Sequence, residues 1–248
     1  MLVLFDVDGT LLLSRGASLR CYRAAARELF GREMNTEGMQ TAGGLDPLIW
    51  RDLCAVNGIG AEEALARHEE FRAAYARILA GELAGGGVAY ALPGVPELLD
   101  ALCDGALGGA GVGAVGGGPA RGGAGIHIGL LTGNYPETGR LKLKAAGISA
   151  ERFAVAAWGD EAERRPDLVP LARERHARHS GRALPPERVV IVGDTPHDVE
   201  CARVHGCRSL AVATGGSPRG ELEAAGASLV VDDLRDTSAL VDWFGAAG

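Results

Sequence analysis

Short apolar runs alternate along the chain with longer amphipathic stretches. The apolar runs predict buried strands at Leu2–Phe5, Ile126–Thr132, Val189–Val192, Leu210–Thr214 and Leu229–Val231. Apolar residues at helical spacing predict helices over Pro136–Ala146, Leu168–His179, Pro196–His205 and Pro218–Ala225. Strands that alternate with helices indicate an α/β fold, in which a parallel sheet is covered on both faces. Ligands of such sheets bind beyond the carboxyl ends of the strands.

One long stretch after the first strand breaks the alternation. Between Ser18 and Leu83 the pattern predicts helices only, over Ser18–Phe30, Pro47–Val56 and Ala61–Leu83. Three consecutive glycines at 85–87 would form the hinge back, and a further helix is expected over Val95–Cys103. The chain therefore reads as an α/β core with an all-helical insert behind its first strand.

Composition narrows the class of protein. The chain has 248 residues, of which 47% are apolar and 23% charged, which is enough to bury a sizeable core. A formal net charge of −7 argues against a nucleic-acid partner. The longest apolar runs are too short for a membrane span. The five cysteines form no CxxC pair, so we expect free thiols and a cytoplasmic protein. Oligomeric state carries no signal in the sequence.

Glycine is unusually frequent, and much of the excess is local. Of the 38 glycines, 11 fall within the 21 residues 105–125, without a Gly-X-Y period. Long loops without structure are uncommon in compact domains, so this tract taken alone would count against a simple α/β fold. We interpret residues 105–125 as a flexible surface insertion, whose closure costs little extra entropy. We expect deletion of residues 108–123 to leave folding and turnover largely intact.

The strongest chemical signal follows the first predicted strand. Asp6-Val7-Asp8-Gly9-Thr10 places two carboxylates at a strand end, where they are costly unless a function uses them. The pair suits phosphoryl transfer with a hard cation. The first carboxylate would attack phosphorus, and the second would protonate the leaving oxygen and then deprotonate water. Magnesium takes oxygen ligands and offsets the repulsion between the two anions.

Two later strands end in similar chemistry. Gly193-Asp194-Thr195-Pro196-His197-Asp198 follows an apolar strand, and its two aspartates could meet Asp6 through the first turn of a helix. Leu130-Leu131-Thr132-Gly133-Asn134 ends in a hydroxyl and a turn, which suits phosphate oxygens. The carboxyl ends of the strands thus predict a carboxylate cluster beside a phosphate site.

The ordered set DVDGT, LLTGN, a basic residue and GDTPHD resembles the haloacid dehalogenase superfamily of hydrolases, across nearly the whole chain. The resemblance implies a Rossmann-like parallel sheet with a mobile helical cap inserted after the first strand. On this reading residues 1–15 and 88–248 form the core and residues 16–87 the cap.

The resemblance also implies roles for single residues. Asp6 would be the nucleophile and Asp8 the general acid and base. Magnesium would be held by Asp6, the backbone carbonyl of Asp8 and Asp194, with Asp198 mostly through water. The phosphoryl group would bind at Thr132, Gly133 and Asn134.

The basic residue of the superfamily's third motif is usually a lysine, and here the sequence departs from the pattern. Of the 25 lysines and arginines only Lys142 and Lys144 are lysines, and they come too soon after Thr132. We expect both to be solvated. Arg164 and Arg165 are the candidates, in a stretch that resembles a phosphoglycolate-phosphatase-like branch. We favour Arg165 as catalytic and phosphate-binding, because it directly precedes the proline and the next helix.

These signs favour a magnesium-dependent phosphomonoester hydrolase of a small phosphorylated metabolite, with phosphoglycolate suggested first. A phosphomutase would use the same aspartates. A dehalogenase has no need of Asp8, and a weakly catalytic binding or regulatory module would explain only the missing lysine. In the cap, the turn at Gly44–Asp46 either faces the substrate or leaves Asp46 as a plain helix cap.

Overall fold

A six-stranded parallel sheet forms the centre of the molecule in the computed structural model, which describes residues 1–105 and 125–246. Its strand order is β5-β4-β1-β6-β7-β8, and each neighbouring pair is parallel. The strands are β1 (Leu2–Phe5), β4 (His127–Leu131), β5 (Val155–Ala157), β6 (Val189–Gly193), β7 (Arg208–Val212) and β8 (Leu229–Val231). The predicted α/β fold with a Rossmann-like sheet is confirmed.

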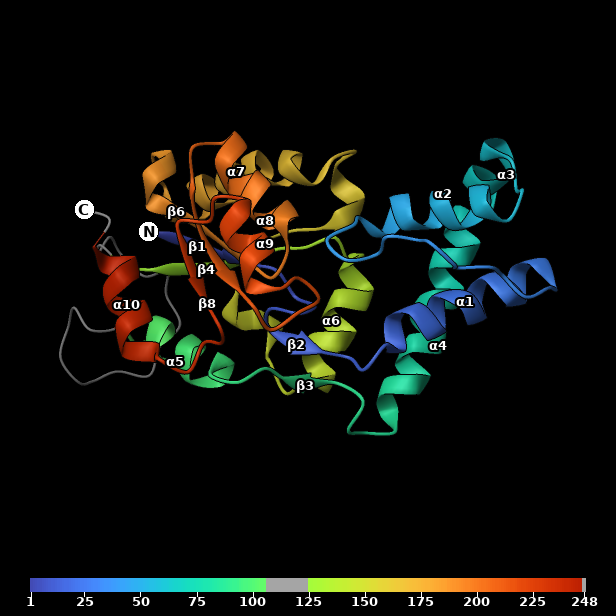
Figure 1. Ribbon diagram of the computed structural model, residues 1–248, viewed down its shortest axis with the longest axis horizontal. Helices are drawn as coiled ribbons and strands as arrows, with labels where there is room; N and C mark the ends of the chain where they lie inside the picture. Colours follow the sequence, from blue (N-terminus) through green and yellow to red (C-terminus); the bar gives the residue numbers. More distant parts are fainter. Residues whose placement is uncertain (106–124, 247–248) are drawn as a thin grey trace.

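Helices cover both faces of the sheet, as expected for buried parallel strands. The apolar residues of β1 alternate between the faces, so Val3 and Phe5 pack with one cluster and Leu2 and Leu4 with another. The first cluster includes residues of α5 (Val95–Gly105), α6 (Pro136–Ala145) and α10 (Thr237–Gly245). The second includes α7 (Leu168–Ser180) and α8 (Pro196–Val204), and Figure 1 shows these two groups on opposite sides of the strands. A short helix, α9 (Arg219–Ala224), packs beside β8.

The segment behind the first strand is helical and has its own apolar cluster. It contains α1 (Ala17–Phe30), α2 (Asp46–Val56), α3 (Ala61–Ala66) and α4 (His68–Ala84), and Figure 1 places it at one end of the molecule. Trp50 stacks on Phe71 with ring centroids 4.0 Å apart, and both are buried among residues of α1 and α4. We call residues 16–87 the cap. That it is a separate domain with these boundaries stays a prediction.

Two short strands connect the cap to the sheet-bearing part of the chain. β2 (Leu12–Leu13) leads into the cap, and β3 (Tyr90–Ala91) leads out of it. They pair antiparallel, with Leu13 opposite Tyr90. The entry and the exit of the cap therefore run side by side.

The structure differs from the expected elements in a few places. The predicted helix over 61–83 is divided at Arg67 into α3 and α4. The pattern of apolar residues does not predict β2, β3, β5 and α10, which are short or lack a distinct periodicity. The predicted flexible insertion at 105–125 lies, apart from its two end residues, outside the described residues.

Two expectations from composition can be compared with the described part of the chain. All five cysteines are free thiols there. Among the helices of residues 1–105 and 125–246, none combines the length and the apolar character needed to cross a bilayer.

Candidate active site

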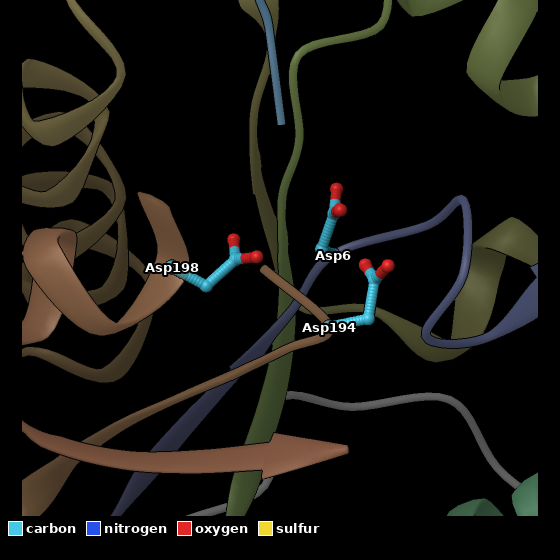
Figure 2. Close-up of side chains that lie close together, drawn as sticks. All are labelled: Asp6, Asp194 and Asp198. Atoms are coloured by element: carbon cyan, nitrogen blue, oxygen red, sulfur yellow. The ribbon is translucent and has the colours of Figure 1, made fainter. Parts of the chain in front are cut away.

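Three buried carboxylates meet at the carboxyl ends of the two central strands. Asp6 follows β1, Asp194 follows β6, and Asp198 lies in the first turn of α8. Each offers an oxygen within 4.8 Å of the others, and Figure 2 shows the three side chains grouped around one space. Hard divalent cations such as Mg²⁺ prefer this oxygen-only donor set.

Glycines leave room for the Asp194 carboxylate. A Cβ at Gly9 or Gly215 would lie 2.3 Å or 1.6 Å from Oδ2 of Asp194, closer than any side chain permits. Gly9 also has a φ of +78°, a left-handed conformation that other residues adopt at a cost. Thr10 donates its hydroxyl proton to Oδ1 of Asp194 over 3.3 Å. The loop after β1 therefore both accommodates and orients this carboxylate.

Burial makes the cluster electrostatically strained without a cation. Desolvation, together with the neighbouring Asp6 and Asp198 charges, raises the pKa of Asp194 to about 8. Desolvation also raises the pKa of Asp6 to about 6, although Arg165 opposes the rise. Two carboxyls that hold protons so far above their usual range form a site that a divalent cation would relieve. The residues present thus fit Mg²⁺.

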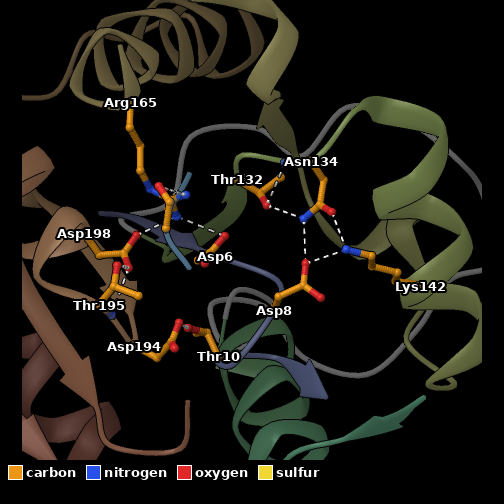
Figure 3. A network of polar contacts seen from close by, with 11 residues as sticks. Asp6, Asp8, Thr10, Thr132, Asn134, Lys142, Arg165, Asp194, Thr195 and Asp198 are labelled. Carbon is orange, nitrogen blue, oxygen red and sulfur yellow. Dashed lines mark hydrogen bonds and ion pairs between the residues drawn. The ribbon is translucent and has the colours of Figure 1, made fainter. Parts of the chain in front are cut away.

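Arg165 lies inside the cluster. Its Nη2 atom is 3.1 Å from Oδ1 of Asp6 and 2.7 Å from Oδ1 of Asp198, as Figure 3 shows. It reaches there from a short 3-10 turn, Arg165–Asp167, directly before α7. Its neighbour Arg164 is 67% exposed in its side chain and pairs with Asp167 at the surface. Of the two candidates for the basic motif residue, Arg165 is the one beside Asp6.

Both oxygens of Asp198 already have partners. Oδ1 accepts from Arg165, and Oδ2 accepts the backbone N–H of Thr195 at 3.2 Å and its hydroxyl at 2.7 Å. Thr195 is the N-cap of α8, so the two residues form a reciprocal capping box. Asp198 therefore orients Arg165 and caps a helix, which suits contact with a metal through water better than direct ligation.

The loop after β4 supplies the second part of the site. Thr132 is fully buried, and its hydroxyl accepts from the Asn134 side-chain amide at 2.8 Å. Gly133 lies so close to the cap that a Cβ there would be 1.9 Å from the carbonyl oxygen of Gly44. The Asn134 amide also donates to Oδ2 of Asp8 over 2.9 Å, which links this loop to the loop after β1.

The expectation that Lys142 is solvated is wrong. Its side chain is 3% exposed, and its ammonium lies 2.7 Å from Oδ2 of Asp8 and 2.5 Å from Oδ1 of Asn134. Lys144, two positions further along α6, is exposed as expected. α6 follows β4, which pairs with β1, so its inner face points at the end of the first strand.

A cavity of about 530 Å³ lies between the carboxylate cluster and the cap. Residues from both parts of the chain line it, among them Asp8, Arg15, Asp46, Tyr75, Lys142 and Arg165. Oδ2 of Asp46 accepts the backbone N–H of Tyr135 at 2.9 Å, and Tyr135 is the N-cap of α6. Asp46 makes no side-chain cap on its own helix, and its carboxylate instead joins the cap to the start of α6.

Lys142 is the residue of the site that the motifs did not reveal. A signal was available, because the two lysines among the 25 basic residues both lie on the helix that follows Thr132. Thr138 lies one turn before Lys142 on that helix and is also buried. The sequence could thus have indicated that this face of α6 is buried. It could not have indicated that the ammonium pairs with Asp8, which lies 134 positions away in sequence.

Comparisons with known proteins bear on the fold and the family. A family model described as HAD-hydrolase-like matches residues 164–237. The chain is 27% identical over 241 residues to the tyrosine-protein kinase PtkA of Mycobacterium tuberculosis, spanning 95% of this chain and 71% of the kinase. A hydrolase from Pseudomonas syringae superposes with a TM-score of 0.66 at 22% identity, with 97% of each chain covered. A predicted phosphoglycolate phosphatase from Haemophilus somnus gives 0.66 at 17% identity, again with 97% of each chain covered. At identities of 22% and 17%, these two solved structures show that the fold is shared.

Proposed function

We propose that this chain, which has the fold and the family match of a haloacid dehalogenase-like hydrolase, is a magnesium-dependent phosphomonoester hydrolase. The likeness to that superfamily expected from the motifs is thereby confirmed, and the reaction is our inference. The observation that carries it is the meeting of Asp6, Asp194 and Arg165 at one point. A nucleophile, a cation site and a fixed positive charge are what phosphoryl transfer to a carboxylate requires.

The residues divide the reaction between them. Asp6 attacks phosphorus, the bond from phosphorus to the leaving oxygen breaks, and Asp8 gives that oxygen a proton. Water then attacks the phosphorus of the aspartyl phosphate, and Asp8 takes a proton from that water. The bond between phosphorus and Asp6 breaks, which regenerates the Asp6 carboxylate and releases inorganic phosphate. Arg165 offsets negative charge on Asp6 and on the phosphoryl group, and Thr132 and the turn at Gly133 and Asn134 hold phosphate oxygens.

This chain's own carboxylates would hold the cation. Asp6 and Asp194 would ligate it directly, together with the carbonyl of Asp8, and Asp198 would contact it through water. Bound Mg²⁺ supplies charge neutralisation for the approach of an anionic nucleophile to an anionic substrate.

The cavity favours a small substrate. Its volume of about 530 Å³ is enclosed in part by cap residues such as Tyr22 and Tyr75. A cavity of this size accommodates a small phosphorylated metabolite and excludes bulk water when the cap is closed. Phosphoglycolate is one member of that class.

Turnover of p-nitrophenyl phosphate, measured with Mg²⁺ and with EDTA, tests the proposal. We expect turnover that requires Mg²⁺ and is lost in Asp6→Asn, which keeps the shape of the side chain but removes the nucleophile. Equal rates in the two proteins would exclude Asp6 chemistry. A panel of phosphorylated metabolites, with phosphoglycolate included, then ranks substrates by kcat/KM.

Phosphoryl transfer to a protein tyrosine is a second candidate, favoured by the similarity to PtkA over 95% of this chain. The same aspartates could serve it if a tyrosine, rather than water, accepts the phosphoryl group. Incubation with γ-labelled ATP and a tyrosine-containing protein separates the two. Label released as inorganic phosphate supports the hydrolase, whereas label retained on tyrosine supports the transferase.

A further inference from the structure

Lys142 is buried beside Asp8, and both residues line the cavity. The Lys142 side chain is 3% exposed, whereas the Asp8 side chain is 39% exposed and lines the cavity. A buried ammonium is costly unless it is paired, so this position for a lysine calls for an explanation. The carboxylate is thus far more accessible from the cavity than the ammonium paired with it.

Both neighbours of Asp8 bind the same oxygen. Lys142 donates to Oδ2 over 2.7 Å, and the Asn134 amide donates to Oδ2 over 2.9 Å. Figure 3 shows these two contacts on one side of the carboxylate. Neither of these two residues donates to Oδ1. One carboxylate oxygen is thus fixed, and the other is left for exchange with a group in the cavity.

The orientation of Asn134 depends on Lys142 in turn. Oδ1 of Asn134 accepts from the ammonium at 2.5 Å, which leaves its Nδ2 atom to donate to Asp8 and to Thr132. A flipped amide would point Nδ2 at the ammonium and Oδ1 at the carboxylate, which is repulsive at both ends. The lysine therefore fixes Asp8 directly and also through the amide.

We propose that Lys142 is a positioning residue, which together with Asn134 pins Oδ2 of Asp8 so that Oδ1 faces the leaving oxygen of the substrate. The inference rests on the proposed function, in which Asp8 exchanges protons with the leaving group and with water. In the first half-reaction the proton moves from Oδ1 to the leaving oxygen as that oxygen departs from phosphorus. In the second, Oδ1 receives a proton from the attacking water.

The test compares a poor and a good leaving group. Phenolate needs a proton as it departs more than p-nitrophenolate does, so loss of Asp8 positioning should weaken kcat/KM for phenyl phosphate selectively. For Lys142→Met we expect a loss of roughly 100-fold on phenyl phosphate and less than about fivefold on p-nitrophenyl phosphate. Lys144→Met, on the exposed face of the same helix, should leave both values unchanged.

Other outcomes overturn the proposal. Equal losses on the two substrates would assign Lys142 to substrate binding or to folding alone, and unchanged values would show that Asp8 needs no such support. In an Asp8→Asn background the Lys142→Met effect should disappear, because the residue acts through Asp8. If Lys142→Met does not fold, Lys142→Gln keeps a shorter donor without charge and is subject to the same comparison.

A crystal structure separates this proposal from the proposed function. In Lys142→Met we expect the Asp8 side chain to leave its place beside Asn134, and an unmoved Oδ2 would overturn the positioning role. This result does not depend on turnover. Wild-type protein no more active than Asp6→Asn would reject the hydrolase and still leave the position of Asp8 to decide the role of Lys142.

Discussion

At the scale of single residues, the site is a set of charges whose partners come from distant parts of the sequence. The motifs predicted which residue types gather at the strand ends, because parallel strands align their carboxyl ends. They did not predict that Lys142 reaches Asp8, since that contact depends on the pairing of β4 with β1. Nor did they show that Asp198 has both oxygens engaged.

The two adjacent arginines provide a matched pair for mutation. Arg165 is 6% exposed and lies between Asp6 and Asp198, whereas Arg164 pairs only at the surface. We expect Arg165→Ala to lower kcat by roughly 100-fold, because charge on the phosphoryl group loses its fixed counterpart. Arg164→Ala should change kcat by less than about twofold. Steady-state kinetics decides, and similar small losses in both variants would contradict the assignment.

The raised pKa of Asp194 predicts a pH-dependent stability. Its folded pKa is about 8 against 3.8 for the free side chain, so between these values the folded protein binds the extra proton. Stability contributed by this group therefore falls as pH rises towards 8. In EDTA we expect the Tm of wild type, relative to Asp194→Asn, to fall between pH 6.5 and pH 8.

Mg²⁺ should reverse that trend, because protons compete with the cation for the same oxygen. The Tm increase on adding Mg²⁺ should be larger at pH 8 than at pH 6.5, and smaller in Asp194→Asn. A wild-type Tm in EDTA that rises relative to the variant over this interval would show that Asp194 is ionised in the metal-free protein.

At the scale of elements, helices and strands with a strong apolar period were predictable, whereas very short strands and the break between two helices were not. The strand at Leu2–Phe5 was placed without error, because a fully buried strand has a distinct apolar run. β5 has only three residues, and β2 and β3 have two each, too few for a period. The division at Arg67 was hidden, because the apolar stripe continues across it.

A latch of charged residues joins cap helix α4 to the core. Arg72 donates to both carboxylate oxygens of Glu137, at 2.5 Å and 2.9 Å, and lies 2.9 Å from Asp160. Glu137 is in the first turn of α6, and Arg72 also lies over the ring of Tyr135. These contacts cross from residues 16–87 to the rest of the chain, so they hold the cap in the position seen in this structure.

Removing the latch should weaken substrate binding more than chemistry. For Arg72→Ala we expect KM to rise roughly three- to tenfold, because a smaller fraction of the protein is closed, with a smaller change in kcat. Arg77→Ala is the control, because this arginine of the same helix pairs with Glu28 inside the cap. A change of the same size in both variants would mean that the latch acts through cap stability and not through closure.

At the scale of the whole molecule, the sheet-bearing part and the cap both line the cavity, and each part has apolar clusters of its own. The cluster that contains Phe5 includes no residue of the cap, and the cluster that contains Trp50 is built almost entirely from it. Its buried residues from outside the cap are Ala89 and Tyr135, and Tyr135 follows β4 but packs into the cap cluster. The cavity therefore lies where the sheet-bearing part and the cap meet, and its shape depends on both.

The pairing of Leu13 with Tyr90 has a consequence for how this protein could be rebuilt. A segment whose two ends are strand partners occupies the place of a hairpin turn, so we expect residues 14–89 to be replaceable as a unit at the β2–β3 pair. Replacing them with a two-residue turn should give a folded minimal enzyme, as judged by circular dichroism and a cooperative thermal transition. Its catalytic cluster would be open to phosphorylated proteins, at the cost of water exclusion and of speed on small substrates. An unfolded product would show that the seam is structural rather than modular.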